Sequence, residues 1–301
     1  MTLYKRYQLK WVFEAPDVIR ACSVLKCPIP PGSYILFGGH DKTLYMMDLK
    51  LNIVNEVSFD GWVRCIHSID LDGDGNHEAV LIGSGDGTMM VLKFDPEKET
   101  LRAIMRYKAE GMITCCTAGD LTSNGSPELL FGCSDKTLRI FQEPFTNEPT
   151  FTLYYDSWVT QCSIGSLKLP EFKDPIQALL IGTKKGMLQL IILEAKKDRY
   201  MPNILWQRYM GTQINVISIG DVNNDGLNEI VVSTNDSFIK ILNSAGENIK
   251  YMRVDNGKSI SLSRPLAIKI DDIDGDKAKE LIVGCADGTL RVYHNPDLNS
   301  N

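Results

Sequence analysis

An acidic segment of nine residues recurs along this chain at a fixed place within a longer repeat. Residues 70–78 read Asp-Leu-Asp-Gly-Asp-Gly-Asn-His-Glu, and residues 221–229 and 272–280 keep acidic or amide side chains at the first, third, fifth and ninth positions. Residues 120–128 form a degenerate fourth copy. Each copy precedes an apolar run, so the chain is assembled from one repeated structural unit.

The repeat has a nearly constant length. Six apolar runs each end in glycine or serine, at positions 38, 83, 132, 182, 233 and 284, with steps of 45, 49, 50, 51 and 51 residues. A step of this size is typical of propellers and solenoids, because each unit has an apolar face that it can bury only against its neighbours.

The second unit shows four predicted strands, at residues 62–69, 77–82, 88–94 and 101–107. Apolar and β-branched residues dominate these runs, and glycine, aspartate and proline separate them. No segment keeps a helical period, which disfavours a helical solenoid. Four strands per unit are typical of a β-propeller blade.

These features predict an all-β fold, a six-bladed β-propeller that fills residues 1–301 as a single domain. The sixth unit ends after its third strand, whereas residues 7–14 form one strand too many before the first unit. We expect this N-terminal strand to pair into the last blade and close the ring, because closure removes open sheet edges. Seven blades are less favoured, since no residues remain to build another. The predicted blades span residues 18–60, 61–110, 111–156, 157–210, 211–256 and 264–294.

The acidic loops and the strand pairs that follow them resemble the FG-GAP repeat family, the integrin-alpha-type propellers, over essentially the whole chain. The size and thiol content are most similar to intracellular members: the propellers of Bardet-Biedl complex subunits, kaptin and integrin-alpha FG-GAP repeat-containing protein. The resemblance implies a place in a multi-subunit assembly. Residues 83–88, 132–137 and 284–289 also resemble WD-repeat blades. That family ranks second, because regular Gly-His and Trp-Asp pairs are missing.

Three of the loops carry the side chains that a hard divalent cation requires. Such a cation takes six or more oxygen ligands, and carboxylates at alternate positions of a tight turn can supply them. We expect two or three Ca²⁺ sites that brace the turns, with Mg²⁺ less favoured by ligand number and flexibility. The main-chain carbonyl serves at position seven of each loop. The predicted ligands are Asp70, Asp72, Asp74, Asn76 and Glu78; Asp221, Asn223, Asp225, Leu227 and Glu229; and Asp272, Asp274, Asp276, Ala278 and Glu280.

The other loops depart from this pattern. Thr122 replaces an acidic residue in the degenerate copy, which predicts weak metal binding or none, and segments 27–32 and 168–175 replace the loop in units one and four. In the last loop Lys277 stands in place of a glycine, which predicts a looser turn or a left-handed lysine. In the alternative interpretation, no metal binds, and the carboxylates stabilise the turns by accepting hydrogen bonds from backbone amides. The degenerate copy keeps Asp120, Asn124 and Glu128.

Bulk properties exclude some classes of partner. A net charge of −6 gives no electrostatic reason to bind nucleic acid or an anionic membrane. No apolar run approaches the roughly 18 residues of a membrane helix, and residues 1–11 lack the apolar core of a signal peptide. The eight cysteines show no zinc-ligand spacing. We expect them to be small core residues in a reducing compartment, which predicts a cytoplasmic protein.

No catalytic motif is present, so the sequence predicts a binding protein rather than an enzyme. The four histidines share no spacing, and neither a nucleophile elbow nor a phosphate loop occurs. In a propeller the first strand of each blade lines the central channel, and the connections that precede those strands lie at one mouth of it. Tryptophan and arginine there are types enriched at interface hot spots. The predicted partner-binding residues are Trp62, Arg64, Met112, Trp158, Arg20 and Arg264.

A protein or an acidic or phosphorylated peptide would suit such a channel mouth. The alternative is that each tryptophan packs between blades and each arginine pairs with a carboxylate such as Asp60 or Asp156. The pairs Lys184–Lys185 and Lys196–Lys197 form a second, less specific candidate surface.

The predicted function is therefore a calcium-stabilised, non-enzymatic protein-interaction scaffold. By resemblance, it would belong to an assembly in membrane trafficking, small-GTPase signalling or nutrient signalling. The competing predictions are a secreted or surface propeller that binds or cleaves glycans, and a WD-type scaffold without metal.

Overall fold

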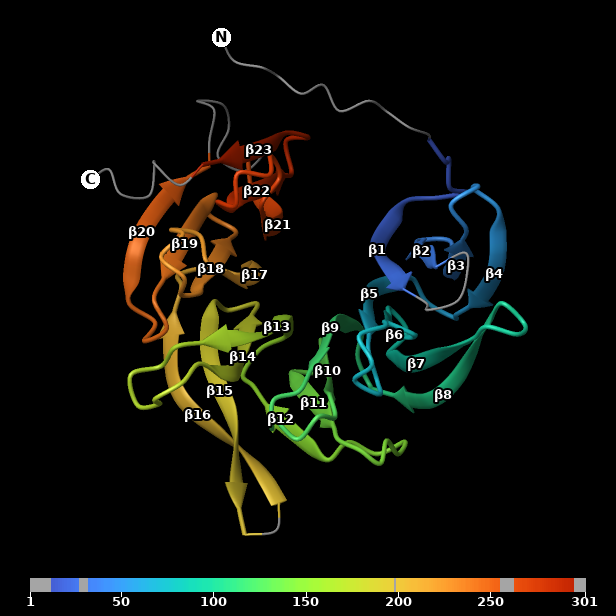
Figure 1. Ribbon diagram of the computed structural model, residues 1–301, viewed down its shortest axis with the longest axis horizontal. Helices are drawn as coiled ribbons and strands as arrows, with labels where there is room; N and C mark the ends of the chain where they lie inside the picture. The colour runs from blue at the N-terminus through green and yellow to red at the C-terminus, as the bar shows by residue number, and fades with distance from the viewer. Residues whose placement is uncertain (1–11, 27–31, 198, 255–262, 295–301) are drawn as a thin grey trace.

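Short antiparallel strands account for all the regular secondary structure in the computed structural model, which describes residues 12–26, 32–197, 199–254 and 263–294. The strands form six sheets that follow one another in chain order around a common centre (Figure 1). Within those residues there is no helix, and so none that could cross a membrane. The prediction of an all-β, six-bladed propeller is confirmed.

Each blade is one meander in which neighbours in the chain are neighbours in the sheet. Blade one comprises β1 (Ile19–Lys26), β2 (Ser33–Gly39), β3 (Thr43–Met47) and β4 (Ile53–Ser58). Blade two comprises β5 (Val63–Ile69), β6 (Ala79–Ser84), β7 (Thr88–Asp95) and β8 (Thr100–Lys108). Blade three comprises β9 (Ile113–Gly119), β10 (Glu128–Cys133), β11 (Thr137–Phe141) and β12 (Phe151–Tyr154).

The second half of the chain repeats the arrangement. Blade four comprises β13 (Val159–Leu167), β14 (Ile176–Thr183), β15 (Met187–Lys196) and β16 (Arg199–Tyr209). Blade five comprises β17 (Ile214–Gly220), β18 (Glu229–Thr234), β19 (Phe238–Leu242) and β20 (Asn248–Arg253). Blade six comprises β21 (Pro265–Asp271), β22 (Glu280–Cys285) and β23 (Leu290–Tyr293). Figure 1 shows the first strands nearest the centre and the fourth strands at the periphery.

The core lies between blades. Every residue of β6, β10 and β18 is buried, because both faces of these second strands are covered. This is why the runs after the acidic loops read as continuously apolar, without the alternation of a half-exposed strand. Clusters of buried side chains accordingly combine adjacent blades, such as Leu36 and Met46 of blade one with Val80 and Ile82 of blade two.

The glycine that ends most of these runs lets the next blade approach. A Cβ atom on Gly83 would lie 2.4 Å from Cγ2 of Ile113, and one on Gly132 would lie 2.7 Å from Cγ1 of Val159. Ile113 and Val159 are the first residues of the following β9 and β13. The repeated glycine is thus a requirement of packing between blades.

The first strand of every blade contains a β-bulge at its second residue. In β5, Val63 pairs with Ser84 and Cys65 with Gly83, so Arg64 has no partner in the register. The same shift occurs in the other five first strands. A bulge redirects the extra side chain out of the sheet pattern. The six bulge residues are Arg20, Arg64, Thr114, Thr160, Asn215 and Leu266.

Blade six has three strands within the described residues. Its predicted fourth strand, at residues 7–14, lies mainly outside them, since residues 1–11 are not described. Residues 12–14 have no regular secondary structure, and the ring of Phe13 lies 5.4 Å from that of Phe37 in blade one. The predicted strand is therefore wrong for residues 12–14, and for residues 7–11 it stays a prediction.

The described cysteines are all free thiols. Cys115, Cys133 and Cys162 are buried, and burial raises the pKa of the Cys133 thiol to about 11. For these three residues the structure agrees with the expectation of small core side chains.

Candidate functional site: the central cavity and the acidic loops

All six bulge residues line one cavity of about 550 Å³ at the centre of the ring. Each bulge occurs at the second residue of the first strand of its blade. The six repeats therefore place six bulge side chains around the centre of the ring. Further lining residues come from the segments around these bulges and include Trp158, Gln161, Lys184 and Gln213. The cavity is therefore built by all six blades together.

The cavity is basic although the chain is acidic. Its lining contains Arg20, Arg64 and Lys184 and no aspartate or glutamate, whereas the whole chain carries a net charge of −6. Like charges gathered without counter-charges in a concave, partly desolvated site attract an anionic ligand. The electrostatic character of the cavity is opposite to that of the molecule.

The two arginines lie in adjacent blades and differ in their contacts. Arg20 donates from Nε to Nε2 of His40 at 2.8 Å, and the His40 ring stacks on Trp62 at 4.2 Å. Arg64 has no ion pair or side-chain hydrogen bond within the described residues, and its Nε is buried without a partner. A buried guanidinium nitrogen without an acceptor favours a ligand that supplies one.

Lys184 is held over the same opening by an aromatic ring. Its Nζ lies 3.7 Å from the centroid of Trp158, within the range of a cation–π contact. The neighbouring Lys185 instead pairs with Asp156 at 3.2 Å. The two lysines of this pair thus have different roles, and only Lys184 faces the cavity.

The uncharged bulge residues connect blades to one another. Thr114 donates from Oγ1 to the carbonyl of Val159 at 2.5 Å, and Thr160 donates to that of Ile214 at 2.8 Å. Asn215 donates to the carbonyl of Pro265 at 3.4 Å. Each acceptor is the first residue of the next blade's first strand. These three bulge residues therefore join neighbouring blades, whereas Arg64 makes no such bond within the described residues.

The predicted partner-binding residues separate into three groups. Arg20, Arg64 and Trp158 meet in the central cavity. Trp62, 41% exposed, and Met112 line a neighbouring hollow of about 340 Å³. Arg264 lines neither cavity and donates from Nη1 to Oδ1 of Asn235 at 3.0 Å.

Sequence reasoning assigned Lys184 to a separate surface instead of the central cavity, and it gave no role to His40, which contacts Arg20 and Trp62. Each lies in the turn after the second strand of its blade, and a repeat alignment that compared those turns could have found them.

The acidic loops lie between the first and second strands of their blades. In blade two, carboxylate oxygens of Asp70, Asp72, Asp74 and Glu78 all lie within 4.8 Å of one another. Backbone amides also bond these groups, with Gly75 donating to Oδ2 of Asp70 at 2.8 Å. Burial and the charge of Asp72 raise the pKa of Glu78, whose Oε2 is buried without a partner. Oxygens so arranged fit a hard divalent cation.

In the acidic loop of blade five, an amide side chain lies among the carboxylates. Asn223 directs its amide nitrogen toward the acidic groups and donates to Oδ2 of Asp225 at 2.9 Å and to Oε1 of Glu229 at 3.3 Å. Burial, together with the charges of Asp225 and Asp221, raises the pKa of Glu229 to about 7. Within the described residues, the carboxylates of this loop do not gather as tightly as those of blade two.

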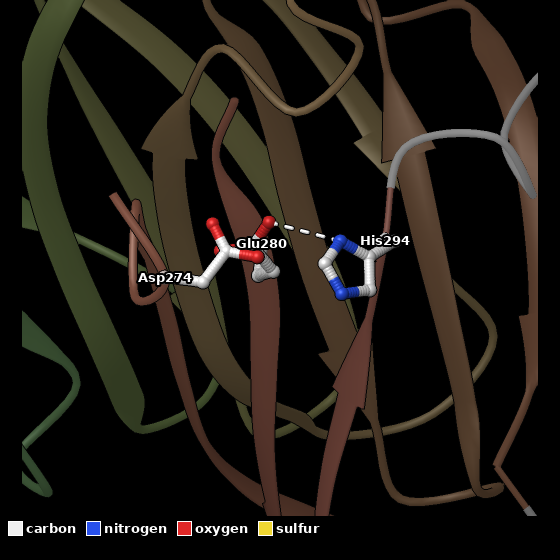
Figure 2. A group of neighbouring side chains, drawn as sticks. All are labelled: Asp274, Glu280 and His294. Atoms are coloured by element: carbon white, nitrogen blue, oxygen red, sulfur yellow. Dashed lines mark ion pairs between the residues drawn. The ribbon is translucent and has the colours of Figure 1, made fainter. Parts of the chain in front are cut away.

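Blade six gathers two overlapping groups of side chains. Asp272, Asp274 and Asp276 form one, and Asp274, Glu280 and His294 form the other. Figure 2 shows the carboxylates of Asp274 and Glu280 facing the imidazole ring of His294. Lys277 has a φ of 75°, so the prediction of a left-handed lysine is confirmed.

The degenerate loop of blade three has its glutamate satisfied by protein donors. Glu128 is buried and accepts from the amide of Leu121 at 2.7 Å and from Nε2 of Gln142 at 3.1 Å. Asp120 accepts from the amides of Asn124 and Gly125. Hydrogen bonds to the protein hold this turn.

Six meandering sheets around a basic central cavity define this chain as a β-propeller. A family model described as the BBS7 beta-propeller matches residues 1–174. Because this match covers more than half of the chain, the protein belongs to the BBS7 β-propeller family. Curated protein sequences give no match.

Two solved structures share the fold. One is the computationally designed protein Ika8, with a TM-score of 0.61 and 16% identity over 92% of this chain and 71% of that chain. The other is BBS1N, crystallised in complex with ARL6DN and soaked with lead, with a TM-score of 0.65 and 11% identity over 95% of this chain and 81% of that chain. At such identities the likeness concerns the fold alone.

Proposed function

We propose that this chain is a non-enzymatic protein-interaction scaffold, a subunit or adaptor of a larger intracellular assembly, whose central cavity holds an acidic segment of a partner protein. The observation that carries the proposal is a cavity with three cationic side chains and no carboxylate in a chain of net charge −6. Membership of a Bardet-Biedl-type propeller family supports a role in trafficking or GTPase-linked signalling.

The chemistry of the cavity favours an extended anionic segment. Arg20 and Arg64 project from bulges of adjacent blades, and guanidinium groups bind carboxylates or phosphates through paired hydrogen bonds. The protein partner in the BBS1N complex supports the choice of a protein ligand for a propeller of this shape.

The geometry does not favour the glycan alternative. A sugar-binding propeller would present open aromatic faces, yet Lys184 lies over the ring of Trp158 and His40 stacks on that of Trp62. Nor does the cavity lining contain an acidic residue that could act as a general acid.

Removing both cavity arginines tests the proposal. We expect the double variant R20Q/R64Q to bind a fluorescent glutamate-rich peptide about tenfold or more weakly, since each charge-assisted contact contributes about 1.5 to 3 kcal/mol. Fluorescence anisotropy measures the affinity, and a phosphothreonine peptide and a neutral peptide distinguish the kind of anion.

The matched control is R102Q/R106Q, which removes the same charge from exposed positions of the outer strand β8. Equal losses in the two double variants would show general charge attraction and would overturn the cavity assignment. Melting temperatures of both variants identify any loss of fold.

We further propose that Ca²⁺ braces the acidic turn of blade two, where four acidic side chains gather. Addition of Ca²⁺ to chelator-treated protein should raise the melting temperature, because a ligand that binds only the folded state stabilises it. The variant D72N should lose most of this increase. An unchanged melting temperature in the wild type would contradict the calcium proposal and leave the cavity proposal intact.

A further inference from the structure

Blade six differs from the other acidic-loop blades in the side chain that faces the terminal glutamate of the loop. In blade two Nζ of Lys93 lies 3.7 Å from Oε1 of Glu78, and in blade three Gln142 donates to Glu128. In blade six Nδ1 of His294 lies 3.1 Å from Oε1 of Glu280. Of these three facing residues, only the histidine is a good metal ligand.

The buried glutamate supplies a second observation that points to a ligand. The side chain of Glu280 has no exposed surface. Its Oε2 accepts from the amide of Ile273 at 3.0 Å, whereas within the described residues its Oε1 makes no hydrogen bond and faces only the ring nitrogen Nδ1 of His294, at 3.1 Å. A buried carboxylate oxygen without a donor is costly unless a cation satisfies it.

The side chains of Asp274, Glu280 and His294 come from the loop and from two adjacent strands and lie close together. Asp274 belongs to the loop, Glu280 begins β22, and His294 follows the end of β23. One ligand atom of each lies within 4.8 Å of the other two (Figure 2). His294 has 56% of its side chain exposed, so an ion can enter from solvent.

We propose that blade six holds a divalent transition-metal ion of the zinc type through Nδ1 of His294, Oε1 of Glu280 and a carboxylate oxygen of Asp274. Water completes the coordination. Imidazole nitrogen favours zinc-type ions, whereas the all-oxygen set of blade two favours Ca²⁺. Because Asp274 also belongs to the group with Asp272 and Asp276, loop-bound Ca²⁺ and the transition metal compete for it.

Cobalt substitution tests this site. Co²⁺ titrated into chelator-treated wild type should give visible d–d absorption bands from one bound ion, and Zn²⁺ should abolish them by competition. The variant H294Q should bind Co²⁺ at least tenfold more weakly. Its melting temperature without metal should stay close to that of the wild type, because His294 lies half exposed at a strand end.

The matched control is D72N, which alters the acidic loop of blade two and should keep the cobalt bands. A wild type that binds no Co²⁺, or an H294Q variant with unchanged bands, would overturn the proposal. Intense near-ultraviolet thiolate bands would assign the ion to cysteine and would overturn it as well. Selective shift of the His294 ring protons among the four histidines, measured by NMR, would support it.

Discussion

At the scale of single residues, the last glutamate of an acidic loop is buried close to the negatively charged aspartates of the same loop. Glu229 is 4% exposed and lies near Asp221 and Asp225, and its pKa is raised from 4.5 to about 7. The folded protein therefore holds a proton on Glu229 more tightly than the unfolded chain does. This contribution to stability is fully present below pH 4.5 and is lost as the pH rises to about 7.

We predict that the metal-free protein loses stability between pH 4.5 and 7 through Glu229. The variant E229Q should flatten this part of the profile, because an amide does not titrate. Urea unfolding at several pH values in the presence of chelator measures the effect. Identical pH profiles for the two proteins would contradict the assignment.

The acidic side chains of the loops were evident from the sequence. Which of their oxygens lie close enough together to share a cation was not. The position of Asn223 shows why: whether an amide directs its oxygen or its nitrogen to its neighbours depends on the donors around it in three dimensions. Likewise, no local pattern in the sequence shows that His294 lies opposite Glu280 across the sheet.

At the scale of turns and strands, Lys277 occupies a backbone conformation that glycine adopts in the equivalent turns. Its φ is 75°, and the corresponding Gly75, Gly125 and Gly226 have φ values of 88°, 89° and 88°. A left-handed conformation costs a residue with a Cβ atom about 1 kcal/mol.

We predict that K277G raises the melting temperature by about 2 °C. Differential scanning calorimetry of the metal-free protein provides the measurement. In the control K279G, a lysine outside the left-handed region is replaced, and the glycine should lower stability instead. If K277G lowered the melting temperature, the Lys277 side chain would stabilise the fold by more than its left-handed backbone conformation destabilises it.

Glycines at one repeat position should differ in their tolerance of substitution. A Cβ atom on Gly83 would lie 2.4 Å from Ile113 and 2.5 Å from Sγ of Cys65, whereas one on Gly284 would meet only Ala267, at 3.5 Å. We predict that G83A costs about 2 kcal/mol through overpacking. G284A should be nearly neutral, and equal effects in urea unfolding would contradict the packing role.

The strands were predictable because their apolar runs and turn residues recur, and the structure confirms those of blade two within two residues at each end. The bulges were not predicted, since a bulge is a property of register between two strands. A signal was present: the second residue of the first strand is polar in five of the six blades, although its neighbours are largely apolar.

At the scale of the whole molecule, the repeat length and strand count were sufficient to predict six blades. How the ring closes was not settled by the same reasoning. Contacts join each blade to the next through their first strands, from β1 and β5 to β17 and β21. Figure 1 shows the first and last blades on opposite sides of the ring's upper end, with no described sheet between them.

The free edge of blade six makes closure testable. In β23, Leu290 is 71% exposed and Val292 is 42% exposed, and within the described residues no fourth strand covers this edge. An uncovered edge with exposed apolar side chains promotes association between chains. If residues 7–11 pair with β23, their removal should expose it.

We therefore predict that deletion of residues 1–11, which keeps Phe13 and its contact with Phe37, increases the self-association of the protein. Light scattering coupled to size-exclusion chromatography measures the mass, and hydrogen exchange should accelerate at the amides of β23. L290K in the truncated chain should reduce the association, because a charged edge resists pairing. A truncated chain with unchanged mass and unchanged exchange in β23 would show that the N-terminal residues do not cover that edge, and that blade six is stable with three strands.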